Sequence, residues 1–286
     1  MKISQAFNFA KLELRECGIE NPFLEATILL THLTSFSKEQ IIFDENLELS
    51  ESQFNSLKHL IARRCHKEPI SHIINNREFF GLDFFVDKNV LDPRPDSEHL
   101  VELALKKIDE MFLGGEIKIL EIGVGSGCLT ISILKNAKNC QALGFDISQD
   151  ALEICAKNIK THELKNRFEI RESNLFSAAS KNEKFDVIIS NPPYIKSQEI
   201  EDLQDEVRIF EPRGALDGGL DGLDFYREIA INAPLFLKEN SILILEIGFD
   251  QKDEVCEIFE ENGFYLDCHK QDLAGRDRVL GFRISK

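Results

Sequence analysis

The sequence predicts an α/β protein with a mostly parallel sheet, preceded by a small all-helical domain. Three observations predict this fold. From residue 116 onward, buried-strand patterns alternate with amphipathic helix patterns, as in parallel sheets with helices on both faces. Residues 1–68 contain helical patterns only. The last two strand patterns are joined by a loop instead of a helix, so we expect an antiparallel hairpin at one edge.

Composition limits the classes of function. The chain has 286 residues, 43% of them hydrophobic, which is enough for one large or two medium domains. A formal net charge of −16 argues against a broad nucleic-acid-binding surface. One local basic cluster, Arg63, Arg64, His66 and Lys67, is interpreted as a solvated helix end.

The cysteines and histidines predict neither a disulfide framework nor a metal site. Seven scattered cysteines without a C-x-x-C pair are typical of buried thiols in a reducing compartment. The histidines show no ligand spacing, so we expect no metal. The charged segment Met1 to Gly18 is no signal peptide, and no apolar run reaches membrane length. We therefore expect a soluble, cytoplasmic protein without membrane contact.

The N-terminal domain, residues 1–68, should contain four helices. Apolar positions on one face predict a helix over 2–17 that stops at Gly18. Asn21-Pro22 predicts an N-cap and a first helical residue, with a helix from Phe23 to about Leu33. Two S-x-x-Q patterns, at Ser37 and Ser50, predict capping boxes that open the third and fourth helices. The fourth helix should end before Pro69. Because no residue of this domain is an obvious catalyst, we interpret it as a recognition or lid domain.

Residues 69–95 should form a β-hairpin and a linker. Arg77–Phe80 and Phe84–Val86 are the expected strands, with Gly81-Leu82-Asp83 as the turn. Prolines on both sides of Arg94 make this segment extended, as a rigid linker or as a wall of the substrate site. Asp96 or Ser97 should cap the next helix, at the start of the third region, residues 96–286.

The third region carries the strand–helix alternation. Strands are predicted at 117–122, 141–145, 168–171, 185–190, 242–247, 264–268 and 278–284. Helices are predicted at 127–134, 149–159, 222–237 and 253–261.

A glycine-rich loop follows the first of these strands. Glu121-Ile122-Gly123-Val124-Gly125-Ser126-Gly127 opens a helix, and Asp146 ends the next strand, where it can bind the ribose hydroxyls of an adenosine. The pattern alone does not choose between NAD and S-adenosylmethionine. The G-x-G-x-G spacing and the Glu121 carboxylate, which can hold a cationic amino group, favour S-adenosylmethionine.

A second motif, Asn191-Pro192-Pro193-Tyr194, follows the strand at 185–190. It places an amide side chain, carbonyl groups and an aromatic ring at a strand end, where open α/β sheets bind ligands. That set is suited to holding a planar group that carries an NH2. The Asn191 side-chain oxygen and the Pro192 carbonyl can accept both N–H bonds of such a group and aim its lone pair at a methyl donor. Positioning of this kind can supply about 7–11 kcal/mol in model reactions, and it needs no strong base.

These motifs resemble those of the peptide chain release factor glutamine methyltransferases (the PrmC/HemK family). The resemblance covers nearly the full length. It rests on the two motifs above and on segments at 77–79, 93–98, 211–212, 215–219, 221–223 and 277–279.

The resemblance implies a class I S-adenosylmethionine-dependent methyltransferase with a Rossmann-like, seven-stranded sheet. It implies methylation of the glutamine side-chain amide in the Gly-Gly-Gln motif of release factors. Asn191 and the Pro192 carbonyl would hold that amide, with Pro193 and Tyr194 beside it and Arg94 in the substrate wall. The cofactor would be held by Glu121, Gly123, Val124, Gly125, Ser126, Gly127, Asp146, Asn174, Leu175 and Asn191.

Five positions depart from the family pattern. Glu121 and Asn174 each stand where Asp is usual, and His72, Asn75 and Asp92 replace Tyr, Gly and an apolar residue. Three alternative functions remain. They are a nucleic-acid methyltransferase acting on an exocyclic amine of adenine or guanine, a dinucleotide-dependent oxidoreductase, and a non-catalytic S-adenosylmethionine-binding module.

Overall fold

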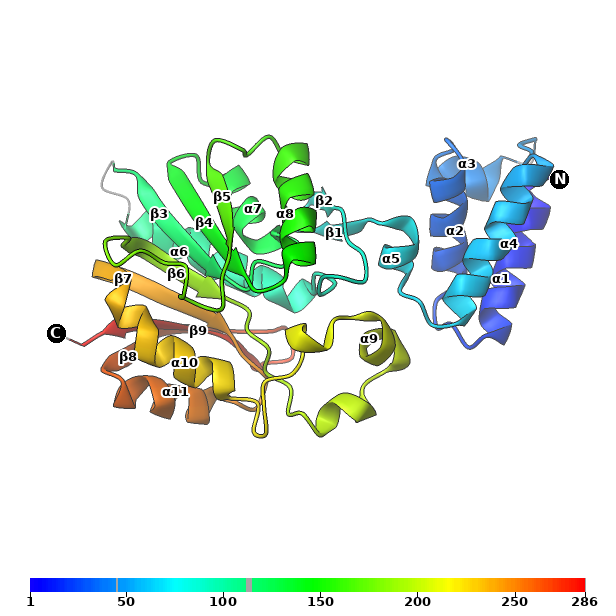
Figure 1. Cartoon of the computed structure of the whole chain (residues 1–286). Coiled ribbons are helices and arrows are strands. Elements are labelled where there is room, and N and C mark those ends of the chain that lie inside the picture. The colour runs from blue at the N-terminus through cyan, green and yellow to red at the C-terminus, as the bar shows by residue number, and fades with distance from the viewer. Residues whose placement is uncertain (45, 112–114, 286) are drawn as a thin grey trace. The chain divides into compact units, whose positions relative to one another are not determined.

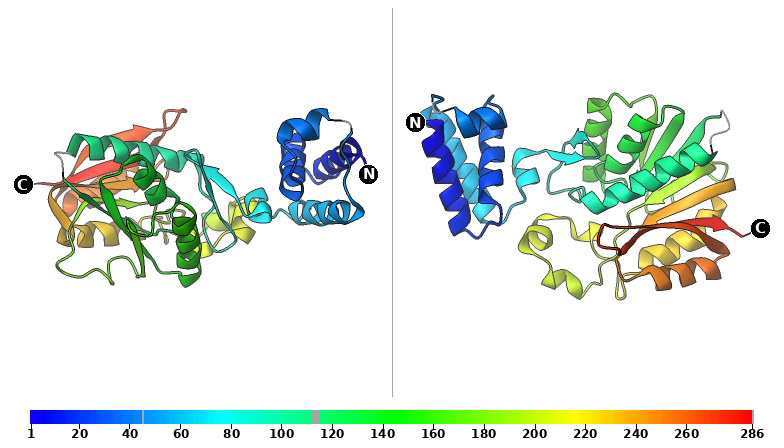
Figure 2. Two further views of the ribbon diagram at one scale, coloured as in Figure 1. Left: turned by 90° about the horizontal axis from the view of Figure 1, so that it is seen from above. Right: turned by 180° about the vertical axis from the view of Figure 1, so that it is seen from behind.

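The computed structural model describes residues 1–44, 46–111 and 115–285. The chain divides into two compact units (Figures 1 and 2). The first, called the helical unit here, comprises Met1–Asn76 together with Gln204–Phe210. The second, called the sheet unit, comprises Arg77–Leu203 and the chain from Glu211 onward. The helical unit therefore extends past residue 68 and includes the distant segment Gln204–Phe210.

The helical unit contains the four predicted helices and two more. They are α1 (Ile3–Glu16), α2 (Pro22–Leu33), α3 (Lys38–Phe43), α4 (Glu51–Cys65), α5 (Ile70–Ile74) and α9 (Asp205–Phe210). Both predicted capping boxes are confirmed, because Ser37 and Ser50 accept hydrogen bonds from backbone N–H groups one turn on. Asn21 precedes α2 as predicted, but its side chain makes no capping bond.

An ion triad secures α9 within the helical unit. Arg64 on α4 lies 2.6 Å from Glu25 of α2 and 2.7 Å from Glu206 of α9. The prediction of a solvated helix end is therefore wrong for Arg64, which is 4% exposed. The charge is tolerated there because two carboxylates meet it, and one of them lies 142 residues away.

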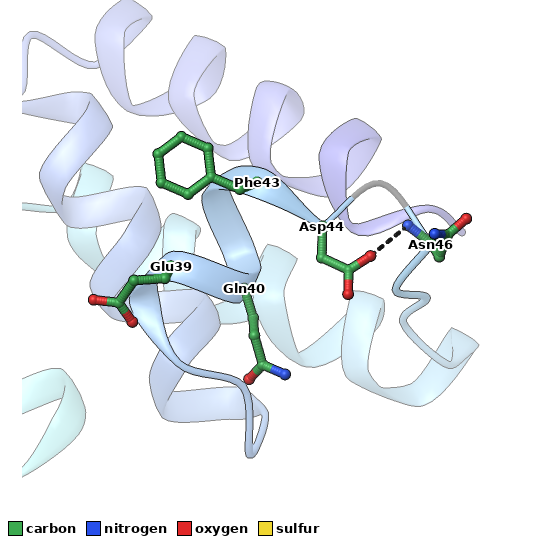
Figure 3. Close-up of a pocket in the computed structure, with 5 residues that line it drawn as sticks. All are labelled: Glu39, Gln40, Phe43, Asp44 and Asn46. Atoms are coloured by element: carbon green, nitrogen blue, oxygen red, sulfur yellow. Dashed lines mark hydrogen bonds between the residues drawn. The ribbon is translucent and has the colours of Figure 1, made fainter.

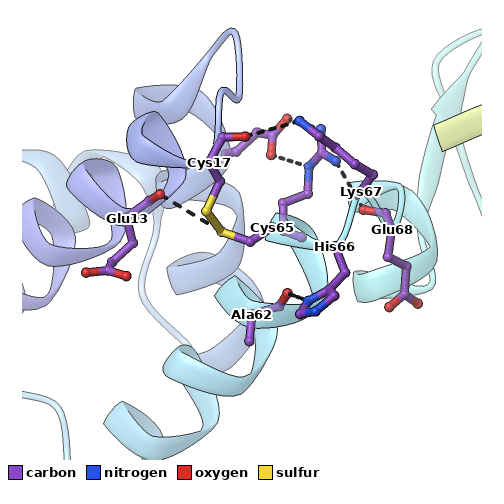
Figure 4. The surroundings of a disulfide bond; sticks show 9 residues. Glu13, Cys17, Ala62, Cys65, His66, Lys67 and Glu68 are labelled. Carbon is purple, nitrogen blue, oxygen red and sulfur yellow. Dashed lines mark hydrogen bonds and ion pairs between the residues drawn. A yellow bond between two sulfur atoms is a disulfide. The ribbon is translucent and has the colours of Figure 1, made fainter. Parts of the chain in front are cut away.

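Cys17 and Cys65 form a disulfide that joins the ends of α1 and α4 (Figure 4). Their Cα atoms are 5.3 Å apart, and Lys67 Nζ donates to the Cys17 carbonyl. The prediction that all seven cysteines are unpaired thiols is therefore wrong for these two. A separation of 48 residues gives no local signal, because the pairing depends on how the two helices pack.

The hairpin and the linker open the sheet unit. β1 (Arg77–Phe79) and β2 (Leu82–Phe84) pair antiparallel around Phe80-Gly81, both with positive φ. We predicted Leu82 and Asp83 to be in the turn, but they belong to the second strand. The predicted cap at Asp96 or Ser97 is also wrong, because Pro95–Ser97 forms a 3₁₀ turn (η1) that leads directly into α6 (Glu98–Met111).

Seven strands form the sheet, as predicted. They are β3 (Ile117–Ile122), β4 (Cys140–Asp146), β5 (Phe168–Glu172), β6 (Phe185–Ser190), β7 (Leu237–Glu246), β8 (Phe264–Gln271) and β9 (Asp277–Ile284). Their order is β5-β4-β3-β6-β7-β9-β8. The first five are parallel, and β9 and β8 form the expected antiparallel pair at one edge.

Helices cover both faces of this sheet (Figure 1). One face packs against α6, α7 (Cys128–Asn136) and α8 (Gln149–Thr161). The other packs against α10 (Asp224–Asn232) and α11 (Lys252–Glu261). Alternate residues of β6 serve the two cores: Val187 and Ile189 face the first layer, and Ile188 faces the second. The strand order reverses between β3 and β6, which is where such sheets bind ligands.

The largest boundary difference concerns the chain before β7. The helix predicted to run to residue 237 ends at Asn232, because Pro234 lies in a 3₁₀ turn, η4 (Ala233–Leu235). The segment between β6 and α10 also contains η2 (Glu199–Asp202) and η3 (Arg213–Ala215), which carry no clear sequence signal. No helix within the described ranges has the length and apolar character needed to span a bilayer.

Candidate active site

A cavity of about 400 Å³ lies in the sheet unit at the carboxyl ends of β3, β4 and β6. Its volume is in the range of small-molecule sites. The structure brings most of the predicted site residues to its wall. These are Arg94, Glu121, Gly123, Val124, Gly125, Ser126, Asp146, Asn174, Leu175, Asn191, Pro192 and Pro193. Gly127 and Tyr194 lie next to lining residues but do not line it themselves.

The glycine loop needs its glycines for two different reasons. Gly123, Gly125 and Gly127 all have positive φ, which other residues adopt only with strain. A Cβ on Gly123 or Gly125 would meet no protein atom within 4 Å, so the backbone there is open to a ligand. A Cβ on Gly127 would lie 2.8 Å from Cys155 Sγ. Gly127 therefore allows α7 and α8 to pack closely.

Asp146 ends β4 and holds the glycine loop in place. Its carboxylate accepts a hydrogen bond from Gly125 N at 2.8 Å and one from Ser148 N at 2.9 Å. A carboxylate has about four acceptor sites, so two remain for a ligand. The side chain thus serves both the loop and the cavity.

Glu121 is a buried carboxylate on the cavity wall. It is 1% exposed and accepts a long hydrogen bond of 3.3 Å from Thr130 N. Burial raises its pKa to about 8; hydrogen bonding with Thr130 lowers it, and the charge of Asp146 raises it. Such a group stays neutral in isolation and becomes charged when a cation binds beside it.

The Asn-Pro-Pro-Tyr segment leaves the sheet directly after Ser190. Ser190, the last residue of the predicted strand, is paired in β6, and its hydroxyl donates to the Ile122 carbonyl at 2.8 Å. Asn191 Nδ2 donates to Ser97 Oγ at 3.2 Å. Pro192 is buried. The segment is therefore anchored on both sides of the proline pair.

Gln251 fixes the position of Tyr194. Its side-chain Nε2 donates to the carbonyl of Tyr194 at 3.0 Å and to that of Gly222 at 3.2 Å, while Oε1 accepts from Gly248 N. Burial raises the pKa of Tyr194 above its usual value. One amide thus joins the chain after β6, the loop before α10 and the loop after β7.

The sequence reasoning gave no role in the site to four residues beside it: Ser97, Glu211, Glu246 and Gln251. A usable signal existed for Glu246, since it ends the central strand that pairs with β6. Glu246 is 2% exposed, and burial raises its pKa to about 7. Gln251 and Glu211 carry no such signal, because their contacts depend on loop packing.

A second hollow lies on the surface of the helical unit (Figure 3). Glu39, Gln40, Phe43, Asp44 and Asn46 line it. It is wide open, and the side chain of Phe43 is 78% exposed. None of the predicted site residues lines it, so the cavity of the sheet unit is the candidate active site. Within the described residues, no three His, Cys, Asp or Glu side chains gather as metal ligands.

Comparisons with known proteins agree with this geometry. Residues 5–74 match the PrmC N-terminal domain, and residues 100–213 match the methyltransferase small domain. A release factor glutamine methyltransferase of Agrobacterium fabrum is 40% identical over 96% of this chain and 94% of its own. A bifunctional methyltransferase of Rickettsia typhi is 39% identical over 97% of this chain, which spans 56% of that longer protein.

A solved structure shows the same fold. A methyltransferase from Pyrococcus furiosus superposes with a TM-score of 0.53 over 77% of this chain and 95% of its own, at 21% identity. This likeness shows the fold alone, whereas the sequence identity to relatives of similar length shows the family. The chain belongs to the release factor glutamine methyltransferase family.

Proposed function

We propose that this protein transfers a methyl group from S-adenosylmethionine to the side-chain amide nitrogen of the glutamine in the Gly-Gly-Gln motif of peptide chain release factors. The observation that carries the proposal is the single cavity that Asn191 and Pro192 share with the glycine loop after β3. The amide-binding motif and the loop that would hold a methyl donor are thereby placed side by side. The names of full-length relatives support the choice of acceptor.

The residues on the cavity wall fit the cofactor. Glu121 offers a carboxylate to its amino group, the open backbone of Gly123 and Gly125 admits its methionine part, and Asp146 has acceptor sites left for ribose hydroxyls. Asn174 and Leu175 line the cavity after β5 and would lie beside the adenine. When bound, S-adenosylmethionine supplies an electrophilic methyl group.

The protein side of the reaction is positioning. Asn191 Oδ1 and the Pro192 carbonyl accept the two N–H bonds of the glutamine amide, which fixes the direction of the nitrogen lone pair. The two acceptors also draw electron density toward a nitrogen that is otherwise a poor nucleophile. No side chain has to remove a proton before the methyl group is transferred, because the product loses its proton after it becomes positively charged.

The proposal also gives a role to each region of the chain and a cellular compartment to the protein. We assign residues 1–68 to recognition of the release factor or to a lid that closes the cleft, residues 69–95 to the β-hairpin and linker, and residues 96–286 to methyl transfer. Since the proposed substrate acts in translation, the protein would work in the cytoplasm. No contact with nucleic acid is needed, which agrees with the net charge of −16.

The proposal is tested by methyl transfer from tritiated S-adenosylmethionine. The acceptors, offered in parallel, are a bacterial release factor, its Gln→Ala variant in the Gly-Gly-Gln motif, and bacterial RNA and DNA. We expect label on the release factor and none on its variant. Label on nucleic acid alone would keep the amine-binding site but overturn the acceptor.

A further inference from the structure

Asn191 has two ends that differ chemically, and only one of them can hold a substrate NH2. An NH2 group needs an acceptor, so Oδ1 must face the substrate and Nδ2 must face the protein. The opposite flip would present two donors to each other. Something in the protein must therefore select one flip of this amide.

We propose that Ser97 and Glu246 are positioning residues that select this flip through a directional hydrogen-bond relay. The inference rests on the proposed function, because it concerns how the same site binds an NH2-bearing acceptor. It goes beyond that function by assigning a role to two residues that do not contact the reacting atoms.

The first step of the relay is set by the sheet. Ser190 of β6 pairs with Leu245 of β7, so Asn191 and Glu246 follow this paired position at the ends of neighbouring strands. Ser97 ends η1, directly before α6, and is 3% exposed. It accepts the hydrogen bond from Asn191 Nδ2 at 3.2 Å. The side chains of Ser97 and Asn191 thus lie together near the end of β7, where Glu246 stands.

A serine hydroxyl alone does not select a flip, because it can donate or accept. An ionised carboxylate can only accept. Burial raises the pKa of Glu246, and the polar side chains of Ser97 and Asn191 beside it act in the opposite direction, toward the ionised form. When Ser97 donates its proton to Glu246, its lone pairs are left to accept from Asn191 Nδ2. Oδ1 of Asn191 is then the end that remains for a substrate.

Structural stability does not explain why Glu246 is there. It is 2% exposed, and its Oε2 has no hydrogen-bond partner among the residues that the structure describes. The nearby guanidinium of Arg278 is instead paired with Asp96 and Asp272, each at 3.0 Å. A buried carboxylate that is only partly satisfied costs free energy. A role in orienting Asn191 gives a reason for that cost.

The kinetic test uses Ser97→Ala, Ser97→Thr and Glu246→Gln. We expect Ser97→Ala and Glu246→Gln to lower kcat by about 10- to 100-fold, because without the relay the productive flip of Asn191 falls to about 10–1% of the population. Ser97→Thr keeps the hydroxyl and should stay within about threefold of wild type. The affinity for S-adenosylmethionine should change little in all three. Ser241→Ala removes another buried serine hydroxyl of the sheet unit, on β7, and is the matched control.

The second test does not depend on turnover. Side-chain NH2 signals are recorded by NMR in protein labelled with ¹⁵N-asparagine, and Asn191 is assigned by the loss of its signals in Asn191→Asp. We expect the Asn191 signals to shift with pH as Glu246 titrates, and to lose this response in Glu246→Gln. Asp96, Arg278 and Tyr194 also face Glu246, so Asp96→Asn is the control that should keep the response.

The outcomes separate this inference from the proposed function. The variants are assayed on whichever acceptor the wild-type protein labels, since a release factor amide and a nucleobase amine both present an NH2. Unchanged kcat in both Ser97→Ala and Glu246→Gln would overturn the relay. The relay would also be overturned if neither substitution changed the Asn191 NH2 signals. This NMR result would count even if the wild-type protein methylated none of the acceptors offered.

Discussion

Arg94 and Glu211 form a two-pronged ion pair, with Arg94 Nη2 at 2.6 and 2.7 Å from the two carboxylate oxygens. The pair links the proline-flanked linker to the segment just after α9. The Glu211 side chain is 2% exposed and that of Arg94 is 33% exposed. Burial raises the pKa of Glu211 to about 7, although Arg94 lowers it. Arg94 thus acts first on Glu211, and only its other N–H groups remain for a substrate.

We expect Arg94→Ala to destabilise the sheet unit by about 2–4 kcal/mol at pH 8.5, because it leaves a buried carboxylate without its cation. The loss should be smaller at pH 5.5, where Glu211 can be protonated. Urea unfolding at the two pH values measures the difference. The double variant Arg94→Ala/Glu211→Gln should recover most of the stability. An equal loss at both pH values would point to lost packing instead of charge.

Asn191→Ala should abolish methyl transfer while binding of S-adenosylmethionine survives. The side chain is bonded to Ser97 and not to the glycine loop, so its removal leaves the cofactor wall in place. Isothermal titration with S-adenosylmethionine and the tritium assay measure the two properties separately. Loss of cofactor binding would instead make Asn191 part of the cofactor site.

Asp146→Ala should weaken cofactor binding by about tenfold or more, since a charged acceptor is worth about 1.5–3 kcal/mol. The change also removes the bonds to Gly125 N and Ser148 N, so the loop loses its anchor. Ser148→Ala removes the hydroxyl that caps α8 through Ala151 N but leaves both bonds to Asp146 possible, so it is a control for disturbance of the chain after β4. Unchanged affinity in Asp146→Ala would exclude the residue from the site.

Glu121→Gln should stabilise the protein at high pH in the absence of cofactor. The pKa of Glu121 is raised from 4.5 to about 8, so the folded state keeps a proton that the unfolded state loses. The contribution of this protonation to the free energy of unfolding is fully present below pH 4.5 and is lost as the pH rises toward 8. We expect a gain of about 1–3 kcal/mol at pH 8.5 and none near pH 4.5.

The same substitution should weaken cofactor binding by about tenfold, since the amide keeps the shape of the carboxylate but not its charge. Thermal unfolding across pH and titration with S-adenosylmethionine check the two expectations. A variant that is no more stable than wild type at pH 8.5 would show that the Glu121 charge is compensated in the folded protein.

The disulfide should stabilise the helical unit by up to about 4 kcal/mol, because a bridge across 48 residues restricts the unfolded chain. Dithiothreitol, or Cys17→Ser/Cys65→Ser, should therefore speed amide hydrogen exchange in α1 and α4 to the same degree. Exchange in β6 serves as the internal control. A thiol count of seven in the untreated protein, instead of the five unpaired cysteines, would contradict the bridge.

The sequence predicted the strands of the sheet and the positions of the two motifs at strand ends, because both depend on residues that are close together in the sequence. β6 has the predicted bounds, Phe185–Ser190, around the β-branched run Val187–Ile189, and Pro192-Pro193 marks where the chain leaves the sheet. Contacts between distant segments could not be predicted in this way. Arg64 was misjudged because its partner Glu206 comes from another part of the chain. Gln251 reaches Tyr194 across 57 residues, and no local pattern encodes such a contact.

The segment Gln204–Phe210 belongs to the helical unit although the chain on both sides of it belongs to the sheet unit. The two units are therefore not consecutive blocks that an engineer can exchange at one junction. A chimera that replaced only the first 76 residues would leave the original Glu206 facing foreign helices, and an isolated N-terminal fragment would lose Glu206 altogether. Recombination between relatives should succeed only where both stretches are inherited from the same parent.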